Sequence, residues 1–395
     1  MKAAWLVVLV AGCGAEAPQP IVPARVLPPD FPADAGTADA AADAGDAGSD
    51  ASPADAPQGV PLDAALPAVA PIDLGPEVWL KGSTHVHAKP SGDSAEPVSS
   101  VIRWYEQRGY DFIALTDHNR VSEVDGSTKG QVAVRAPAQG LIVLSGVELT
   151  FNPTGCEPPG EDSGKCRIHL NALGVTERPE GKLEWANRTT KLRTEMYAAG
   201  FAQSKVLGAH VIQINHPNWY WGMTPDVLAE LAKHAPLVEI ANVQFETWNA
   251  GDKDHLSLEA QWDVVLQRGG TLWGVASDDA HDYDDLLKGK YPPGGGWVVV
   301  KSRRDPRAIL DALATGRFYS STGVTLSRAE PDGDELVVEV TADKRKHTIA
   351  FIENGKTVAT VKGLTARRSI PKNGYLRAVV TRDDGKKAWV QPVRR

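Results

Sequence analysis

The chain has 395 residues, of which 42% are hydrophobic and 23% are charged, and its formal net charge is −8. This composition is that of a soluble globular protein long enough for one large domain and a smaller one. Neither the charge nor any basic patch indicates nucleic acid as a partner, so that class of function is excluded.

The first residues predict an export signal. Lys2 precedes a short apolar run, 3–10, which is too short to span a bilayer as a permanent helix. The segment Val10-Ala11-Gly12-Cys13 resembles the bacterial lipobox, in which the cysteine becomes the lipidated first residue of the mature protein. An ordinary secretory signal with an incidental cysteine is the alternative. Gly14, where an aspartate would favour the inner membrane, predicts a lipid anchor on the outer membrane or cell surface, with the folded part in the periplasm or outside.

Residues 1–13 would then be the lipoprotein signal, with Cys13 as the lipidation site, and residues 14–75 a tether. The tether is rich in Ala, Asp, Pro and Gly and has few large apolar residues. Such a segment cannot bury enough surface to offset its chain entropy, so we expect disorder. It also carries much of the negative charge, so the net charge says little about a catalytic surface.

Residues 76–324 alternate between apolar strand patterns and helical patterns. Helical spacing covers 98–105, and Thr224-Pro225 and Asp305-Pro306 are typical helix starts. Strands are expected over 78–80, 111–115, 141–144, 211–214, 237–240 and 271–275. The alternation predicts an α/β fold with a parallel sheet, closed into a barrel, and function at the carboxyl ends of the strands.

Residues 325–395 have a different texture, in which short alternating strand patterns are separated by turn sequences. Strands are expected over 336–340, 347–352, 375–380 and 388–390. The pairs Asn354-Gly355, Asn373-Gly374 and Asp384-Gly385 are typical hairpin turns. A small antiparallel domain of β-sandwich type is therefore predicted here.

Cys156 and Cys166 flank a turn-rich loop. In an exported protein this spacing favours a disulfide, which closes a short loop. A thiolate metal site is the alternative, although no Cys-X-X-Cys partner accompanies the pair.

The motifs that carry chemistry follow the predicted strands. His85 and His87 would leave the same face of a strand about 7 Å apart, close enough to hold one metal ion. Alone the pair is weak evidence, but similar ligand-rich segments recur along the chain. They are Thr116-Asp117-His118-Asn119, Gly146-Val147-Glu148, His169-Leu170-Asn171, Asn215-His216-Pro217 and Ser277-Asp278-Asp279-Ala280-His281.

The order of these motifs resembles that of the polymerase and histidinol phosphatase (PHP) superfamily, and within it the carbaryl-hydrolase-like branch. The resemblance covers about 78–321 and implies a distorted (β/α)7 barrel with two to three divalent metals, zinc, manganese or iron. It also implies three sets of ligands: His85, His87, Glu148 and Asp279; Glu148, His169 and His216; and Asp93, His118 and His281. Many relatives have Ser-Asp-Gly where this chain has Ser91-Gly92-Asp93, so the carboxylate is shifted by one position. The spacing to His281 selects Asp279 over Asp278 as ligand.

The chemistry of the residues agrees with this grouping. A glutamate can bridge two cations, and two close metals lower the pKa of a bridging water, which favours hydrolysis. Asp117 could orient the histidine that follows it, or be a turn residue at a strand end. Arg167 is a candidate clamp for a small anionic substrate, with a surface salt bridge as the alternative. The aromatic run 218–221 could wall a substrate pocket or cover the barrel mouth.

The sequence therefore predicts a metal-dependent hydrolase, with a phosphoester as the favoured substrate. Hydrolysis of a carbamate, ester or amide is the second candidate, in keeping with the resemblance to carbaryl hydrolases. A surface protein that binds a glycan or partner without catalysis is a third.

Overall fold

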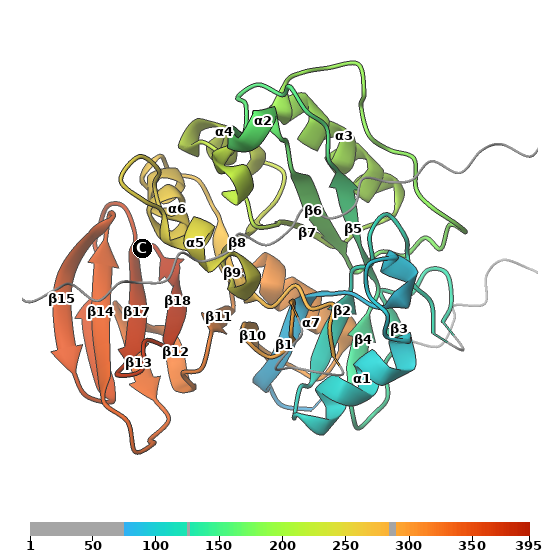
Figure 1. Ribbon diagram of the computed structural model, residues 1–395. Coiled ribbons are helices and arrows are strands. Elements are labelled where there is room, and N and C mark those ends of the chain that lie inside the picture. Colours follow the sequence, from blue (N-terminus) through green and yellow to red (C-terminus); the bar gives the residue numbers. More distant parts are fainter. Residues whose placement is uncertain (1–74, 125–126, 284–289) are drawn as a thin grey trace, which may run out of the picture. The chain divides into compact units, whose positions relative to one another are not determined.

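The computed structural model describes residues 75–124, 127–283 and 290–395 (Figure 1). The predicted signal, the lipidation site Cys13 and the predicted tether lie outside the described residues, apart from Gly75. Within the described ranges, no helix combines the length and the apolar character needed to cross a bilayer.

The fold is mixed α/β (Figure 1). The helices are α1 (Val98–Gln107), α2 (Glu161–Gly164), α3 (Arg193–Val206), α4 (Pro225–Leu231), α5 (Glu246–Ala250), α6 (Leu258–Gln267) and α7 (Pro306–Ala314). The strands up to residue 277 are β1 (Val78–Val86), β2 (Phe112–Leu115), β3 (Ala133–Arg135), β4 (Ile142–Leu144), β5 (Gly146–Phe151), β6 (Ile168–Leu173), β7 (Val211–Ile214), β8 (Leu237–Asn242) and β9 (Trp273–Ser277). The later strands are β10 (Trp297–Ser302), β11 (Phe318–Ser321), β12 (Leu326–Asp332), β13 (Glu335–Val340), β14 (His347–Glu353), β15 (Lys356–Lys362), β16 (Thr365–Ser369), β17 (Leu376–Arg382) and β18 (Lys387–Val393).

The predicted helix starts are confirmed by their caps. The side chain of Thr224 accepts a hydrogen bond from the backbone N–H of Val227, and Asp305 accepts one from Ala308. In both helices a proline occupies the first turn, where its missing N–H costs nothing. Helix α1 buries Val101 and Tyr105 on one face, as the spacing of its apolar residues predicts.

The strands form three sheets, and the prediction of a parallel sheet is correct only in part. In the five-stranded sheet, β5-β6-β7-β8-β9, the pairs β7-β8 and β8-β9 are parallel, whereas β5-β6 and β6-β7 are antiparallel. The connection from β5 to β6 is a loop that returns the chain at the same end of the sheet, so no parallel crossover forms. The connection from β6 to β7 contains helix α3, yet these two strands are antiparallel as well. A helix between two strands therefore does not by itself make them parallel.

The ten-stranded sheet has the order β15-β14-β17-β18-β11-β10-β1-β2-β4-β3. Strands β1, β2 and β4 are parallel neighbours, and β10 joins the other edge of β1 in antiparallel pairing. Within the described residues the strand pairings form no closed barrel. Two isolated bridges, Val86 with Ala280 and His118 with Glu148, nevertheless connect this sheet with the five-stranded one. Both bridges include or adjoin predicted metal ligands.

The C-terminal strands form a sandwich-like arrangement. The three-stranded sheet β12-β13-β16 shares a hydrophobic core with the β14-β17-β18 part of the ten-stranded sheet, through residues such as Val338 and Phe351. The pair Asn354-Gly355 forms the expected two-residue hairpin turn, with positive φ at both positions. Asn373-Gly374 forms no hairpin, because β16 and β17 belong to different sheets. The ten-stranded sheet crosses the predicted boundary at 324, because β11 pairs with β18.

Candidate metal centre

Eight of the predicted ligands lie in β1, β2, β5, β6, β7 or β9 or within four residues after one of them, and Asp93 lies in the loop after β1. The fold brings all nine together. Seven of the side chains are at most 3% exposed, and only Asp93 (16%) and His118 (15%) retain some exposure. They form three groups in which the candidate ligand atoms lie within 4.8 Å of one another. These groups are His85, His87 and Asp279; Glu148, His169 and His216; and His87, Asp93, His118 and His281.

The first group lies at the end of β1. The Nε2 atoms of His85 and His87 lie 3.1 and 3.2 Å from the same oxygen, Oδ1 of Asp279. The two oxygens of Glu148 approach these nitrogens as well, at 3.5 Å from His85 and 3.6 Å from His87. Asp279 has a positive φ of 46°, so the chain turns sharply directly after β9 and aims the carboxylate at the two rings.

The second group shares Glu148 with the first. Oε1 of Glu148 lies 3.0 Å from Nδ1 of His169 and 3.6 Å from Nε2 of His216. Asn215 donates a hydrogen bond of 2.9 Å to the same oxygen. Glu148 therefore stands between two groups of imidazoles, as a bridging carboxylate would.

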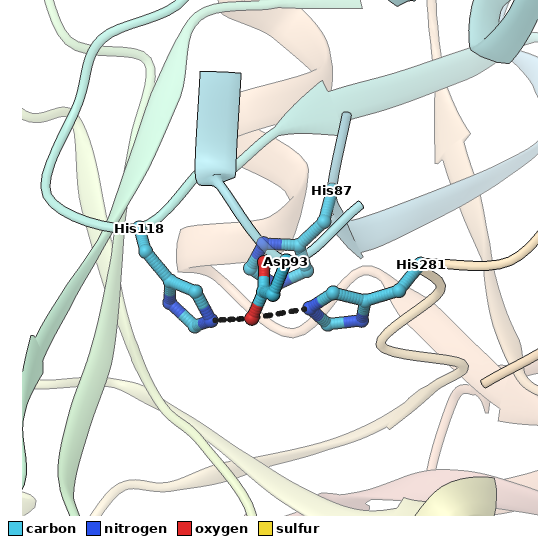
Figure 2. A group of neighbouring side chains, drawn as sticks. All are labelled: His87, Asp93, His118 and His281. Carbon is cyan, nitrogen blue, oxygen red and sulfur yellow. Dashed lines mark ion pairs between the residues drawn. The ribbon is translucent and has the colours of Figure 1, made fainter. Parts of the chain in front are cut away.

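The third group contains the displaced carboxylate. Oδ2 of Asp93 lies 3.0 Å from Nε2 of His118 and 3.4 Å from Nε2 of His281, and Figure 2 shows the carboxylate between the two rings. Gly92 adopts φ +94° before Asp93, a conformation that glycine adopts readily. The shift by one position in the sequence therefore does not remove the carboxylate from the group.

The chemistry of these donors fits divalent metal ions. Buried polar atoms normally have hydrogen-bond partners, yet among the described residues the Nε2 atoms of His85 and His87 have none. Both nitrogens face the carboxylates of Asp279 and Glu148. Neutral imidazole and carboxylate together suit zinc, manganese and iron, so these buried groups could hold metal ions.

Burial and neighbouring charges set the protonation of the cluster. Burial, together with the nearby His281 and His118, lowers the pKa of His87 to about 3. Burial opposes protonation of His85 too, but Asp279, Glu239 and Glu148 hold its pKa well above the ordinary value. Burial opposes ionisation of Glu148, yet the surrounding histidines hold its pKa well below the ordinary value. These shifts favour a proton on the ring of His85, a neutral ring at His87 and negative charge on Glu148.

We expect divalent metal binding to release protons and to weaken as the pH falls. His85 and His118 have raised pKa values, so at neutral pH they hold protons that a metal must displace. The affinity should therefore rise with pH in the range above the ordinary pKa of histidine, where these two rings give up their protons. Titration calorimetry in buffers of different ionisation enthalpy measures the released protons directly. Binding enthalpy that does not depend on the buffer would contradict this expectation.

Asp117 does not orient the neighbouring histidine as the sequence suggested. One carboxylate oxygen accepts a hydrogen bond of 2.6 Å from the backbone N–H of Ala88, and the other accepts one from the hydroxyl of Ser122. Among the described residues, no hydrogen bond joins this carboxylate to an imidazole. Because Ala88 follows His87, Asp117 holds the backbone directly after that residue. Burial raises the pKa of Asp117 to about 6.

Arg167 lies next to the aromatic run that follows His216. Its guanidinium is over the rings of Trp219, at 4.8 Å, and Tyr220, at 4.9 Å. Trp219 in turn contacts the rings of His169 and His216. Trp219 is 2% exposed and Tyr220 7%, so both rings are buried. Trp219 therefore packs against the second ligand group, whereas Trp221 stacks on His255.

Two further carboxylates lie close to the ligands. Asp278 accepts hydrogen bonds from Ser83, Tyr105 and the backbone of Gly294, none of which is a candidate ligand. Glu239 in β8 accepts one of 2.7 Å from Nδ1 of His85 and was not singled out in the sequence. The sequence did contain an indication of this role, because a glutamate inside the apolar run 237–240 is unusual for a buried strand.

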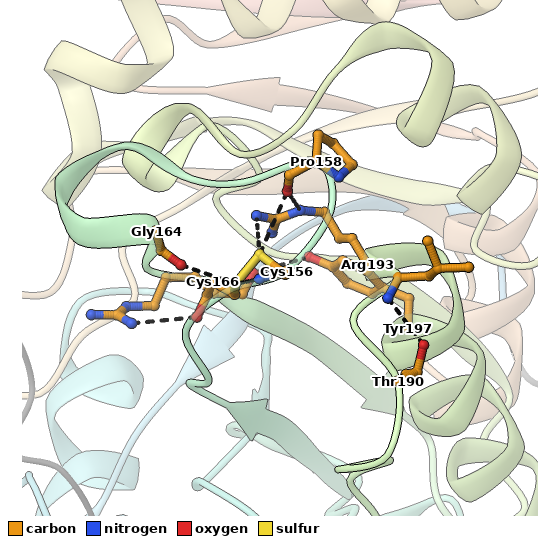
Figure 3. The surroundings of a disulfide bond; sticks show 9 residues. Cys156, Pro158, Gly164, Cys166, Thr190, Arg193 and Tyr197 are labelled. Carbon is orange, nitrogen blue, oxygen red and sulfur yellow. Dashed lines mark hydrogen bonds between the residues drawn. A yellow bond between two sulfur atoms is a disulfide. The ribbon is translucent and has the colours of Figure 1, made fainter.

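The predicted disulfide joins Cys156 and Cys166 in the loop between β5 and β6. Both cysteines are buried, and Figure 3 shows the guanidinium of Arg193 beside them. Arg193 donates hydrogen bonds to Sγ of Cys156 and to the carbonyl oxygen of Pro158. Because Arg193 belongs to α3, these contacts fasten the loop to that helix.

Replacing both cysteines with serine should lower stability without abolishing metal binding. Closing a loop between residues 10 apart is worth about 2 to 3 kcal/mol, and neither cysteine belongs to a ligand group. Thermal unfolding with and without reductant measures the effect, and reductant should lower the midpoint of the unchanged protein only. Loss of metal binding in the variant would contradict the purely structural role.

Comparison with protein-family models gives no match, and comparison with curated proteins gives none either.

Proposed function

We propose that this protein is a metal-dependent hydrolase and that a phosphoester is its substrate. One observation carries the proposal: residues spread from 85 to 281 meet in three buried groups of imidazoles and carboxylates that Glu148 and His87 connect. Isolated charges are costly to bury, so a cluster of this size at strand ends supports a functional site over a structural one. Two to three divalent ions per chain would fill these groups.

Bound metals would supply an activated water and stabilise the charge that develops on the attacked oxygen. The side chains of the protein would hold the metal ions and the substrate in place. Glu148 holds two ligand groups at a fixed separation, and Asn215 fixes its Oε1 by a hydrogen bond of 2.9 Å. Asp93 and His118, the most exposed members, form the side from which a substrate would approach. Arg167, whose guanidinium lies 4.8 Å from the centre of the Trp219 ring, would contribute positive charge toward an anionic substrate.

We further infer that β1, β2, β5, β6, β7, β8 and β9 form a distorted barrel of the type found in the PHP superfamily. The two isolated bridges support this inference, because one links β1 to the segment after β9 and the other links β5 to the segment after β2. The antiparallel β5-β6-β7 segment is one source of the distortion.

The test is a metal and substrate screen on the chain without its first 74 residues. We expect two to three bound divalent ions, fewer in His85→Ala, and metal-dependent hydrolysis of nitrophenyl phosphate. Hydrolysis of naphthyl carbamate or acetate in place of the phosphate would support the second candidate, the carbamate or ester hydrolase. If the protein binds no divalent metal after reconstitution, the proposal is wrong. The remaining candidate is then a surface protein that binds a partner without catalysis.

The proposal includes export and attachment to a membrane through a lipid on Cys13, outside the described residues. Its support is the lipobox-like sequence alone. Cys13→Ala should move the full-length protein from the membrane fraction to the soluble fraction of the producing cells, and an unchanged distribution would contradict lipid attachment.

A further inference from the structure

Glu239 is a fully buried carboxylate that lies behind the ligand groups without belonging to any of them. Its two oxygens accept hydrogen bonds from five different residues. These donors lie in β1, β7, β8 and β9 or directly after β7. The donors to Oε1 are His85 Nδ1 at 2.7 Å, Ser277 Oγ at 2.6 Å and Gln213 Nε2 at 3.3 Å. The donors to Oε2 are the backbone N–H of His216 at 2.6 Å and Asn242 Nδ2 at 3.1 Å.

This environment determines which nitrogen of His85 carries a hydrogen. Every neighbour donates and Glu239 only accepts, which is the arrangement of an ionised carboxylate. His85 must therefore present Nδ1–H to Glu239. Its Nε2 atom then faces Asp279 and Glu148 with a lone pair available once the ring is neutral. A histidine that binds metal through one nitrogen commonly donates the other N–H to a carboxylate in this way.

The same carboxylate also holds the chain at His216, a member of another ligand group. His216 has φ +23°, a backbone conformation that a residue with a side chain adopts only under constraint. The hydrogen bond from its N–H to Oε2 of Glu239 is one such constraint. A single carboxylate thus contacts ligands that arrive from β1 and from β7.

We propose that Glu239 is a positioning residue for the metal centre: it fixes the tautomer and orientation of His85 and the backbone of His216. This inference rests on the proposed metal-dependent function. Glu239 acts through these two residues and belongs to none of the three ligand groups. Its removal should weaken metal binding without removing a ligand.

The substitution Glu239→Gln tests this directly. The amide keeps the size of the side chain but turns one acceptor into a donor, which then faces another donor. Loss of a supporting carboxylate typically weakens metal binding about 10- to 100-fold, and we expect a loss in that range. Competition with a chromophoric chelator measures the affinity. Glu239→Asp provides a second variant, because it keeps the charge but withdraws it from His85 by one methylene, and should weaken binding similarly.

Two comparisons separate positioning from a general structural effect. Asp278→Asn is the matched control, because Asp278 is equally buried but contacts no ligand side chain, and it should leave the affinity unchanged. In a double variant with His85→Ala, the combined loss should be smaller than the product of the two single losses, because Glu239 acts largely through His85.

The outcomes are distinct. Wild-type affinity in Glu239→Gln would overturn the inference alone, and so would losses that simply multiply in the double variant or an equal loss in Asp278→Asn. If the unchanged protein binds no divalent metal, the proposed function fails and this inference fails with it.

Discussion

Glu148→Gln should abolish metal-dependent hydrolysis. It should also weaken metal binding by more than about 100-fold, the upper range for the loss of a carboxylate that only supports a ligand. The oxygens of Glu148 lie within 3.6 Å of five imidazoles, those of His85, His87, His118, His169 and His216. The amide keeps the shape of the side chain and can still accept the hydrogen bond from Asn215. It removes the negative charge that would be shared by two metal ions.

The fold should survive this change, because glutamine has nearly the volume of glutamate and leaves no cavity. Metal content, measured on the purified variant, should fall by more than one ion per chain, and excess metal should not restore activity. The same substitution at Glu195, an exposed residue on α3, should change neither property. Wild-type turnover in Glu148→Gln would show that Glu148 does not bridge metal ions.

Arg377→Met should destabilise the protein by about 3 to 5 kcal/mol, the usual cost of removing one partner of a buried ion pair. Arg377 on β17 is 2% exposed and donates two hydrogen bonds of 2.7 Å to the carboxylate of Asp263 on α6. Tyr375 donates a third, of 2.6 Å, to Oδ1 of Asp263. The guanidinium also lies over the ring of Trp262. The pair therefore joins the C-terminal strands to a helix of the predicted barrel region.

Urea unfolding followed by fluorescence measures this loss. Methionine preserves most of the length of the side chain, so the effect reports the charge and hydrogen bonds rather than a cavity. Adding Asp263→Leu should restore part of the stability, because the unpaired buried carboxylate is then removed as well. A loss below about 1 kcal/mol would indicate a pair that contributes no more than a surface salt bridge.

The sequence alone pointed to the nine candidate ligands that the fold brings together and to much of the local structure. The nine residues grouped in the structure are the nine candidate ligands of the sequence, because most of them stand in short polar motifs that follow apolar strand patterns. The starts of α4 and α7, the hairpin at Asn354-Gly355 and the Cys156–Cys166 disulfide are likewise local in origin. Caps, turns and short loops depend on neighbouring residues, so a single sequence can specify them.

Contacts between distant segments were decided only by the tertiary structure. The antiparallel direction of β5 and β6, the hydrogen bond from Ala88 to Asp117 and the ion pair between Arg377 and Asp263 have no local signature. Glu239 is the clearest case, because its role depends on donors at 85, 213, 216, 242 and 277. Buried polar groups need partners wherever the chain can supply them, and only the folded arrangement shows which partners those are.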